Sequence, residues 1–253
     1  MKKLRIALGA HHSLALLPEA GEAATAIVAQ LGLPAYGAVL AVVGSAGSLG
    51  PQLLPRLRQL FGQAVASAAQ QATAVLLDGG TQAGVMALLG EAVAALGYAT
   101  PLVGVAPAAL VNCSPAPAPP AAVALEPHHS HFVLTPGTKW GDETSTLFGI
   151  VEALRGPARP AALLLVGGGA VAHTELLAAV RLGLPIVVLA GTGGLADELA
   201  AAWPTRSVAS SLASPILTEV MTNGHVQFYA LEASAEGLKA VLLHHLSAAT
   251  AAA

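Results

Sequence analysis

Residues 74–81 read Ala-Val-Leu-Leu-Asp-Gly-Gly-Thr: an apolar run that ends in a carboxylate and a pair of glycines. A helical pattern follows from Gly84 to about Leu96. A short, unbroken apolar run of this kind is typical of a strand that is covered on both faces. A strand, a glycine turn and a helix in this order form the repeating unit of an α/β fold with a parallel sheet.

The same unit recurs along the chain. Apolar runs at residues 38–43, 161–166 and 185–190 also end in glycine clusters and lead into helical patterns. Further strands are predicted at residues 4–8, 101–105, 131–135 and 226–231, and further helices at residues 19–31, 52–71, 144–154, 173–182, 195–203 and 235–246. We therefore predict an α/β, Rossmann-like open sheet, mostly parallel, with helices on both faces.

The expected organisation is a single Rossmann-like domain over residues 1–253. Its core spans about 38–202, with an N-terminal strand and helix in residues 1–36 and a C-terminal strand and helix in residues 205–247. Six prolines fall within residues 106–127. Because proline removes a backbone donor and restricts its neighbour, we expect a surface flap without regular structure, which adjusts when a ligand binds.

The composition excludes several classes of protein. Hydrophobic residues make up 55% of the 253 residues, which excludes a disordered chain. The net charge of −3, with only 11 scattered Lys and Arg residues, argues against nucleic acid as a partner. No stretch of roughly 20 apolar residues is uninterrupted, so we expect no membrane span. A single cysteine and the lack of a convincing signal peptide favour the cytoplasm, and the low charge weakly favours a homo-oligomer.

The glycine clusters predict an anion site. Glycine lets the backbone approach a phosphate closely, and the following helix directs free N–H groups at it. Because the carboxyl ends of parallel strands share one edge of a sheet, the turns can converge on one nucleotide-derived ligand, whose phosphate could carry Mg²⁺. The predicted ligand-binding residues of the turns are Gly44, Ser45, Gly47, Gly79, Gly80, Thr81, Gly167, Gly168, Gly169, Gly191, Thr192 and Gly193.

Polar residues next to these turns give further candidates. Asp78 could bind ribose hydroxyls or a magnesium-bound phosphate, or it could hydrogen-bond N–H groups of its own loop. Thr81 could cap the next helix or contact phosphate. Lys139 offers a cation for phosphate, and Asp142 could contact the ligand or only cap a helix.

Three histidines lie close together, at positions 128, 129 and 131. In an extended segment, alternate side chains point to opposite faces, so His129 and His131 are expected to share a face without His128. With no cysteine nearby and no clear acidic partner, we predict no metal site. His131 is expected to donate a hydrogen bond to the ligand.

Four segments together resemble a known family. They are residues 78–86 (DGGTQAGVM), 125–134 (LEPHHSHFVL), 139–143 (KWGDE) and 190–200 (AGTGGLADELA). In this order and spacing they are similar to the prokaryotic branch of the SLOG superfamily that is related to the cytoplasmic N-terminal region of melastatin-type TRP channels. The resemblance implies a Rossmann-like fold and a pocket for a nucleotide-derived, ADP-ribose-like molecule.

The resemblance leaves catalysis open. The superfamily includes phosphoribohydrolases with the loop Pro-Gly-Gly-x-Gly-Thr-x-x-Glu, whose counterpart here, residues 167–175, keeps Glu175 but lacks the internal Gly-Thr pair. We therefore favour binding or sensing over hydrolysis, with Glu175 complementing a helix dipole. The alternative is a nucleotide N-glycosidase or transferase that uses Asp142, Glu143 or Glu175 as acid-base groups. A third hypothesis is an assembly module without a ligand, in which substitution of Gly80 would leave function intact.

Overall fold

The structure, a computed structural model, describes residues 1–9, 11–112, 122–205 and 214–247. The strands are β1 (Lys2–Leu8), β2 (His11–Leu17), β3 (Ala38–Gly44), β4 (Ala74–Asp78), β5 (Leu102–Pro107), β6 (Val111–Asn112), β7 (Val123–Ala124), β8 (His131–Thr135), β9 (Ala161–Val166), β10 (Pro185–Ala190) and β11 (His225–Ala230). The α-helices are α1 (Ala24–Leu31), α2 (Leu54–Leu60), α3 (Ser67–Gln71), α4 (Gly84–Ala95), α5 (Thr144–Arg155), α6 (Ala170–Arg181), α7 (Gly194–Ala202), α8 (Pro215–Asn223) and α9 (Ala235–Leu246).

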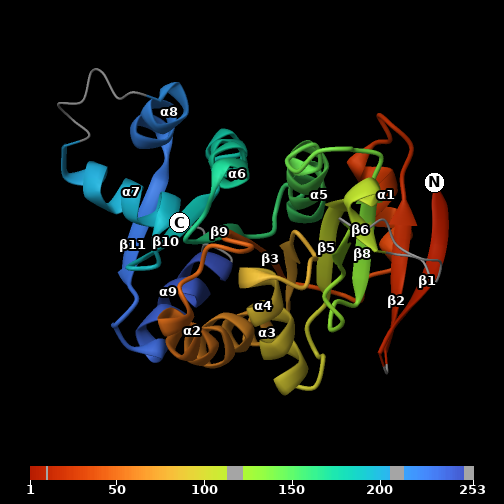
Figure 1. The fold of residues 1–253 in the computed structure, drawn as a ribbon, viewed down its shortest axis with the longest axis horizontal. Coiled ribbons are helices and arrows are strands. Elements are labelled where there is room, and N and C mark those ends of the chain that lie inside the picture. Colours follow the sequence, from red (N-terminus) through yellow and green to blue (C-terminus); the bar gives the residue numbers. More distant parts are fainter. Residues whose placement is uncertain (10, 113–121, 206–213, 248–253) are drawn as a thin grey trace.

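One sheet contains nine of these strands, in the order β1-β2-β8-β5-β4-β3-β9-β10-β11 (Figure 1). All neighbouring pairs are parallel except β1 with β2. The chain builds outward from β3 through β4, β5 and β8, and then returns to the other side of β3 with β9. Strand order therefore reverses between β3 and β9, and a doubly wound sheet binds its ligands at such a point. The predicted α/β, mostly parallel, Rossmann-like sheet is confirmed.

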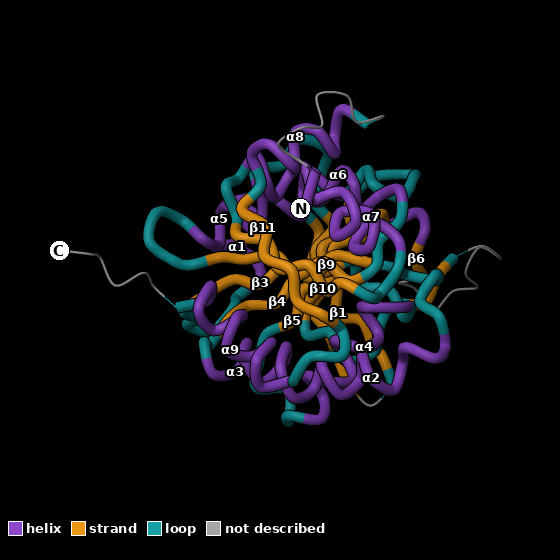
Figure 2. Tube along the Cα trace, turned by 90° about the vertical axis from the view of Figure 1, so that its left-hand side faces the viewer, coloured by secondary structure: helices purple, strands orange, loops and turns teal. Residues whose placement is uncertain are grey.

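Two layers of helices cover the sheet, as Figures 1 and 2 show. Helices α1, α5, α6, α7 and α8 pack in one hydrophobic cluster, and α2, α3, α4 and α9 pack in the other. Alternate residues of a single strand serve the two layers: Val39 and Val43 of β3 belong to the first cluster, and Leu40 and Val42 to the second. Burial on both faces explains why the central strands are continuous apolar runs.

The helix predicted at residues 52–71 is a continuous helical stretch with an irregular centre. A π-helical segment, Phe61–Ala66, separates α2 from α3, and a 3₁₀ turn, Pro51–Leu53, precedes α2. Within the described part of the chain, no helix combines the length and apolar character needed to cross a bilayer.

The prediction for the N-terminal extension was incomplete. Strand β2 pairs antiparallel with β1 and parallel with β8, so residues 1–36 contribute two strands and the helix α1. Strand β2 begins with three polar residues, so it lacks the continuous apolar pattern of the central strands. His11 and His12 are exposed at this end, whereas Ser13 is buried and donates its hydroxyl hydrogen to the carbonyl oxygen of His129 at 2.5 Å.

The expectation that residues 106–127 lack regular structure was wrong for the described residues of this segment. A 3₁₀ turn, Ala108–Leu110, precedes β6, and β6 pairs in parallel with β7. Leu125 forms a further bridge to Thr81. Proline is absent between Ala108 and Asn112 and between Ala122 and Glu126, which leaves the backbone N–H groups there free to pair. Residues 113–121, where four of the six prolines lie, are outside the described part of the chain.

Candidate functional site

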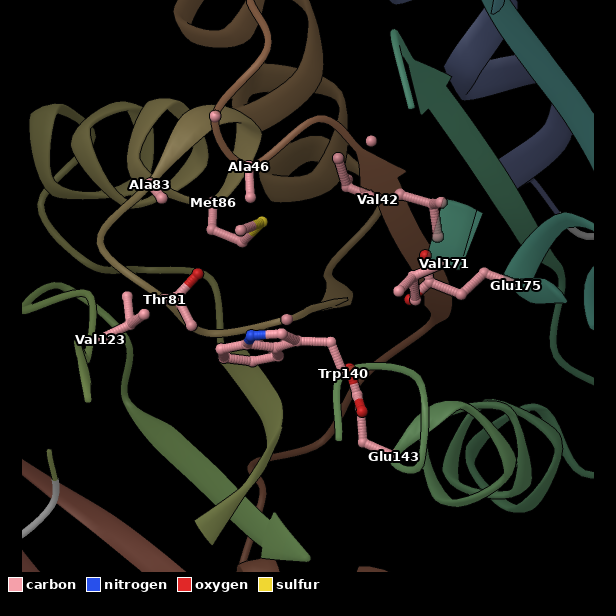
Figure 3. Close-up of a pocket in the computed structure, with 14 residues that line it drawn as sticks. Val42, Ala46, Thr81, Ala83, Met86, Val123, Trp140, Glu143, Val171 and Glu175 are labelled. Atoms are coloured by element: carbon pink, nitrogen blue, oxygen red, sulfur yellow. The ribbon is translucent and has the colours of Figure 1, made fainter. Parts of the chain in front are cut away.

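A cavity of about 310 Å³ lies at the carboxyl ends of β3 and β4, beside the point where strand order reverses. Residues after β3 and β4 form one part of the wall, and helix α6, which follows β9, forms another (Figure 3). The cavity is therefore lined from both sides of this point. Its volume is at the lower end of the range of small-molecule sites. The lining residues are Val42, Val43, Gly44, Ala46, Gly47, Gly79, Thr81, Ala83, Met86, Val123, Trp140, Glu143, Val171 and Glu175.

The turn after β3 packs against its neighbours at glycine positions. A Cβ on Gly44 would overlap the carbonyl oxygen of Val166, and a Cβ on Gly84 would overlap that of Ser45. Gly84 also has a positive φ of 49°. These two glycines therefore let the β3 turn, the end of β9 and the start of α4 meet closely.

The turn after β3 also presents free donors. The backbone N–H groups of Ala46, Gly47 and Ser48 donate to no acceptor within the described residues, and all three residues are exposed. Ala46 and Gly47 line the cavity. This turn therefore retains the donors that an anion site requires.

The turns after β9 and β10 differ, because side chains already bind their N–H groups. The N–H of Gly168 donates to Ser45 Oγ at 2.8 Å, and that of Gly167 donates to Thr192 Oγ1 at 2.7 Å. The N–H groups of Gly191 and Gly193 donate to the two carboxylate oxygens of Asp197, at 2.6 and 3.0 Å. None of the predicted ligand residues in these two turns lines the cavity, nor does Ser45.

Two acidic side chains line the cavity. Glu143 is at the N-cap position of α5, where its carboxylate accepts the N–H of Gly141 at 2.8 Å, and it is 5% exposed. Glu175 is on the second turn of α6 and is 9% exposed. Burial raises the pKa of Glu143. Burial also raises the pKa of Glu175 to about 8, and the charges of Glu143 and Asp78 add to this rise. Glu175 is therefore a neutral acid at pH 7 and can donate a hydrogen bond. It lies beyond the first turn of its helix, so the predicted dipole role does not explain its position.

Of the loop residues before α5, Trp140 lies at the cavity, whereas Lys139 and Asp142 lie away from it. Trp140 is 45% exposed, and its indole extends across the cavity toward Thr81 (Figure 3). Lys139 is exposed and does not line the cavity. Asp142 faces a separate groove and accepts hydrogen bonds from the N–H groups of Thr138 and Lys139, both at 2.9 Å, which lower its pKa.

Thr81 and Asp78 resolve two of the alternatives left open by the sequence. Helix α4 begins after Ala83 with no side-chain cap, so Thr81 does not cap it, and its side chain lines the cavity. Asp78 is fully buried, and its Oδ1 accepts the N–H of Gly80 at 2.7 Å, as expected for a loop-stabilising aspartate.

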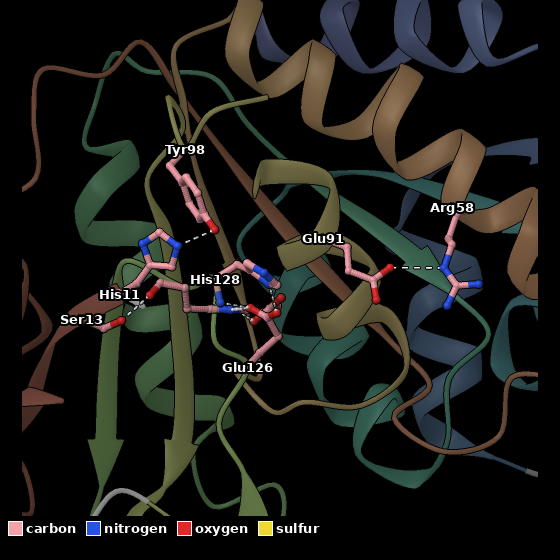
Figure 4. A network of polar contacts seen from close by, with 9 residues as sticks. His11, Ser13, Arg58, Glu91, Tyr98, Glu126 and His128 are labelled. Atoms are coloured by element: carbon pink, nitrogen blue, oxygen red, sulfur yellow. Dashed lines mark hydrogen bonds and ion pairs between the residues drawn. The ribbon is translucent and has the colours of Figure 1, made fainter. Parts of the chain in front are cut away.

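Asp78 is also the end of a buried ionic network. Its Oδ1 contacts His129 Nε2 at 2.7 Å, and His129 Nδ1 contacts Glu126 Oε2 at 2.7 Å. Glu126 Oε1 in turn contacts His128 Nδ1 at 2.6 Å, as seen in Figure 4. Asp78 Oδ2 is buried and has no hydrogen-bond partner among the residues that the structure describes. A Cβ on Gly90 of α4 would overlap the Glu126 carboxylate, so this glycine makes the space that the network occupies.

The central member of this network is an imidazolium. Burial alone lowers the pKa of His129, but the charge of Asp78 and the hydrogen bonds that the ring donates to both carboxylates outweigh it and raise the pKa to about 9. Burial raises the pKa of Glu126, but the hydrogen bond from His129 and the charge of His129 outweigh burial and lower this pKa below its usual value. One positive charge between two negative charges stabilises all three in the interior.

The prediction that the histidines lack an acidic partner was therefore wrong, and so was their grouping. His128 and His129 share Glu126, whereas His131 begins β8, at the amino edge of the sheet, and contacts Ser130 Oγ at 2.8 Å. His131 consequently lies away from the cavity. No group of three or more His, Cys, Asp and Glu residues within the described ranges is arranged to hold a metal ion.

Sequence reasoning missed Glu126 as part of the site's support, together with the cavity walls Met86 and Val171. Glu126 was visible as an acid three residues before His129, a spacing that permits contact in a turn. Nothing local distinguishes Met86 and Val171 from other apolar helix residues.

A family model described as "SLOG in TRPM, prokaryote" matches residues 37–239. The chain belongs to this SLOG family. Membership indicates binding or processing of a nucleotide-related ligand, and the matched region contains every residue that lines the cavity. A comparison with curated proteins gives no significant match.

Proposed function

We propose that this SLOG protein binds a nucleotide-derived small molecule, ADP-ribose-like or similar, in the cavity at the ends of β3 and β4, as a sensor of that molecule. The observation that supports this most is the cavity's composition. It combines an aromatic side chain, two acids and free backbone donors beside the point where strand order reverses. Ligands of doubly wound sheets bind at that point.

Each part of the cavity suits one part of such a ligand. The indole of Trp140 offers a flat face for a base. Glu143 and Glu175 suit ribose hydroxyls, which both donate and accept. The N–H groups of residues 46–48 suit a phosphate at the exposed edge.

Binding is tested by calorimetry of the full chain with ADP-ribose, NAD, AMP and cyclic dinucleotides. We expect at least one to bind and Trp140→Ala to weaken it about tenfold, since base–aromatic stacking contributes roughly 1–3 kcal/mol. Trp203→Ala, a matched change of an aromatic that packs on Phe228 away from the cavity, should leave affinity unchanged. A screen without any binder would remove the basis of the proposal.

A second candidate is hydrolysis of a nucleotide N-glycosidic bond. It is favoured by two carboxyl groups with raised pKa in one cavity, since a general acid must be protonated near neutral pH. The experiment is to incubate AMP with the protein and measure ribose phosphate and free base. Product release that Glu175→Ala or Glu143→Ala abolishes would favour this activity over binding alone, and Asp142→Ala serves as the matched control.

A further inference from the structure

The charge of the cavity walls is unsuited to a phosphate group. Its lining contains the carboxyl groups of Glu143 and Glu175 and, among the described residues, no Lys, Arg or His side chain. The nearest residue in sequence with a cationic side chain, Lys139, does not contribute to the lining. A phosphate inside would lose its hydration without gaining a compensating cation and would lie near the carboxyl of Glu143, which is costly in a partly enclosed site.

Backbone donors favour the mouth of the cavity. Gly80 donates to Asp78, Gly168 to Ser45, and Gly167 to Thr192. Among the described residues, the N–H groups without an acceptor include those of residues 46–48, which are exposed, and those of Gly79 and Val171, which are separate donors in the wall. The exposed run at residues 46–48 therefore offers a phosphate more adjacent hydrogen bonds than the wall does.

The interior suits uncharged polar groups and an aromatic ring. Glu175 is almost fully buried and protonated at pH 7, so it presents one donor and one acceptor. Thr81 adds a hydroxyl, and Trp140 adds an aromatic face. Ribose hydroxyls and the ring nitrogens of a base are complementary to this set.

We infer that the cavity encloses the uncharged nucleoside part of its ligand, base and ribose, and leaves the phosphate groups outside at residues 46–48. This inference rests on the proposed function and narrows its ligand. The volume of about 310 Å³ agrees with it, because a site at the lower end of the usual range holds part of a dinucleotide-sized molecule and not the whole.

The test compares nucleosides with their phosphates. Adenosine, guanosine, cytidine and uridine, their 5′-monophosphates, ADP-ribose and pyrophosphate are titrated into the full chain at pH 7. We expect the preferred nucleoside to bind within about fivefold of its monophosphate, a difference of about 1 kcal/mol, and pyrophosphate not to displace it. A monophosphate that binds a hundredfold more tightly, or displacement by pyrophosphate, overturns the inference and leaves the proposed function standing. Absence of binding by nucleosides, monophosphates and ADP-ribose alike overturns both.

A pH profile tests the donor. The charged groups that face Glu175 are Glu143 at the start of α5 and Asp78 at the end of β4. Ionisation of Glu175 removes its donor, so nucleoside affinity should fall about tenfold between pH 7 and pH 9. Glu175→Gln keeps a donor and cannot ionise, so it should bind the nucleoside at pH 7 and show no such fall.

The matched control is Glu219→Gln on α8, where the carboxylate pairs with Arg181 at the surface. It should retain the fall seen in the unmodified protein. A Glu175→Gln protein that still loses affinity between pH 7 and pH 9 would overturn the role of Glu175, and with it the inference.

Discussion

The carboxyl edge of the sheet carries glycine-rich turns on both sides of the point where strand order reverses, and the two sides differ in what binds their N–H groups. After β3, the N–H groups of residues 46–48 donate to no acceptor in the described part of the chain, and Ala46 and Gly47 line the cavity. After β9 and β10, the N–H groups of four glycines donate to Ser45, Thr192 and Asp197. A glycine-rich turn is therefore a candidate ligand site after β3, whereas the turns after β9 and β10 stabilise the fold. The difference arises because side chains bind the N–H groups after β9 and β10.

The largest expected loss of stability comes from disruption of the buried network of Asp78, His129 and Glu126. Replacement of His129 by Leu removes the imidazolium that lies between the buried carboxylates of Asp78 and Glu126, and should lower the free energy of unfolding by about 3–5 kcal/mol. Urea unfolding at pH 6.5 measures this. Exposed His12→Leu, the matched control, should change stability by less than about 0.5 kcal/mol.

The pH dependence of this effect has a definite sign. The pKa of His129 is about 9 in the folded protein and near 6.5 when unfolded, so the folded state holds the proton more tightly. Its stabilisation is fully present below pH 6.5 and is lost as the pH rises through about 9. The difference between the unmodified protein and His129→Leu should shrink over this window, and a constant difference would contradict an imidazolium at this position.

The next effect tests whether the β3 turn depends on close backbone packing. Gly84→Ala introduces a Cβ that overlaps the carbonyl oxygen of Ser45, at a positive φ, and should cost about 3 kcal/mol. Gly32→Ala, also at a positive φ but in the left-handed helical region and with nothing within 4 Å of its Cβ among the described residues, should cost only about 1 kcal/mol. Equal losses for the two variants in thermal or urea unfolding would show that packing at Gly84 is not the cause.

A smaller loss of stability is expected from removal of the hydrogen bonds that hold the turn after β10. Asp197→Ala leaves the N–H groups of Gly191 and Gly193 without their acceptors and should cost about 1–2 kcal/mol. Ligand affinity should not change, because Asp197 and these glycines do not line the cavity. Glu198→Ala, an exposed neighbour on the same helix, is the control for general effects on α7. A loss of affinity in Asp197→Ala would indicate that the two sides of the edge act together.

The smallest effect on stability gives the sharpest functional contrast. Gly47 and Gly169 both have open space where a Cβ would lie and a φ outside the positive region, so alanine at either should change stability by less than about 0.5 kcal/mol. Only Gly47 lines the cavity, so only Gly47→Ala should weaken ligand binding, by about tenfold. Gly80 cannot serve in this comparison, because its positive φ and contact with Gly104 would disturb the fold. Equal affinities for the two variants would argue that residues 46–48 are not part of the site.

Local sequence determined most of the strands and helices and the edge at which the site lies. The apolar runs at residues 38–43, 74–78, 161–166 and 185–190 all form central parallel strands, because burial on both faces requires apolar residues at every position. Strand β2 was not predicted, since its start is polar. Its place is decided by pairing with β8 and by the contact of Ser13 with His129, just before β8.

Tertiary structure alone decided which glycines remain available and which acids lie together. Glu143 and Glu175 are 32 positions apart, and Asp78, Glu126 and His129 come from two distant segments. A backbone N–H is free or bound according to the acceptors that folding brings near it, and a carboxyl group's pKa depends on its burial and neighbouring charges. Neither the availability of an N–H group nor the pKa of a carboxyl group is set by the local sequence. The glycine-rich motifs therefore identified the edge of the sheet, and the packing of the whole chain determined where on this edge the site lies.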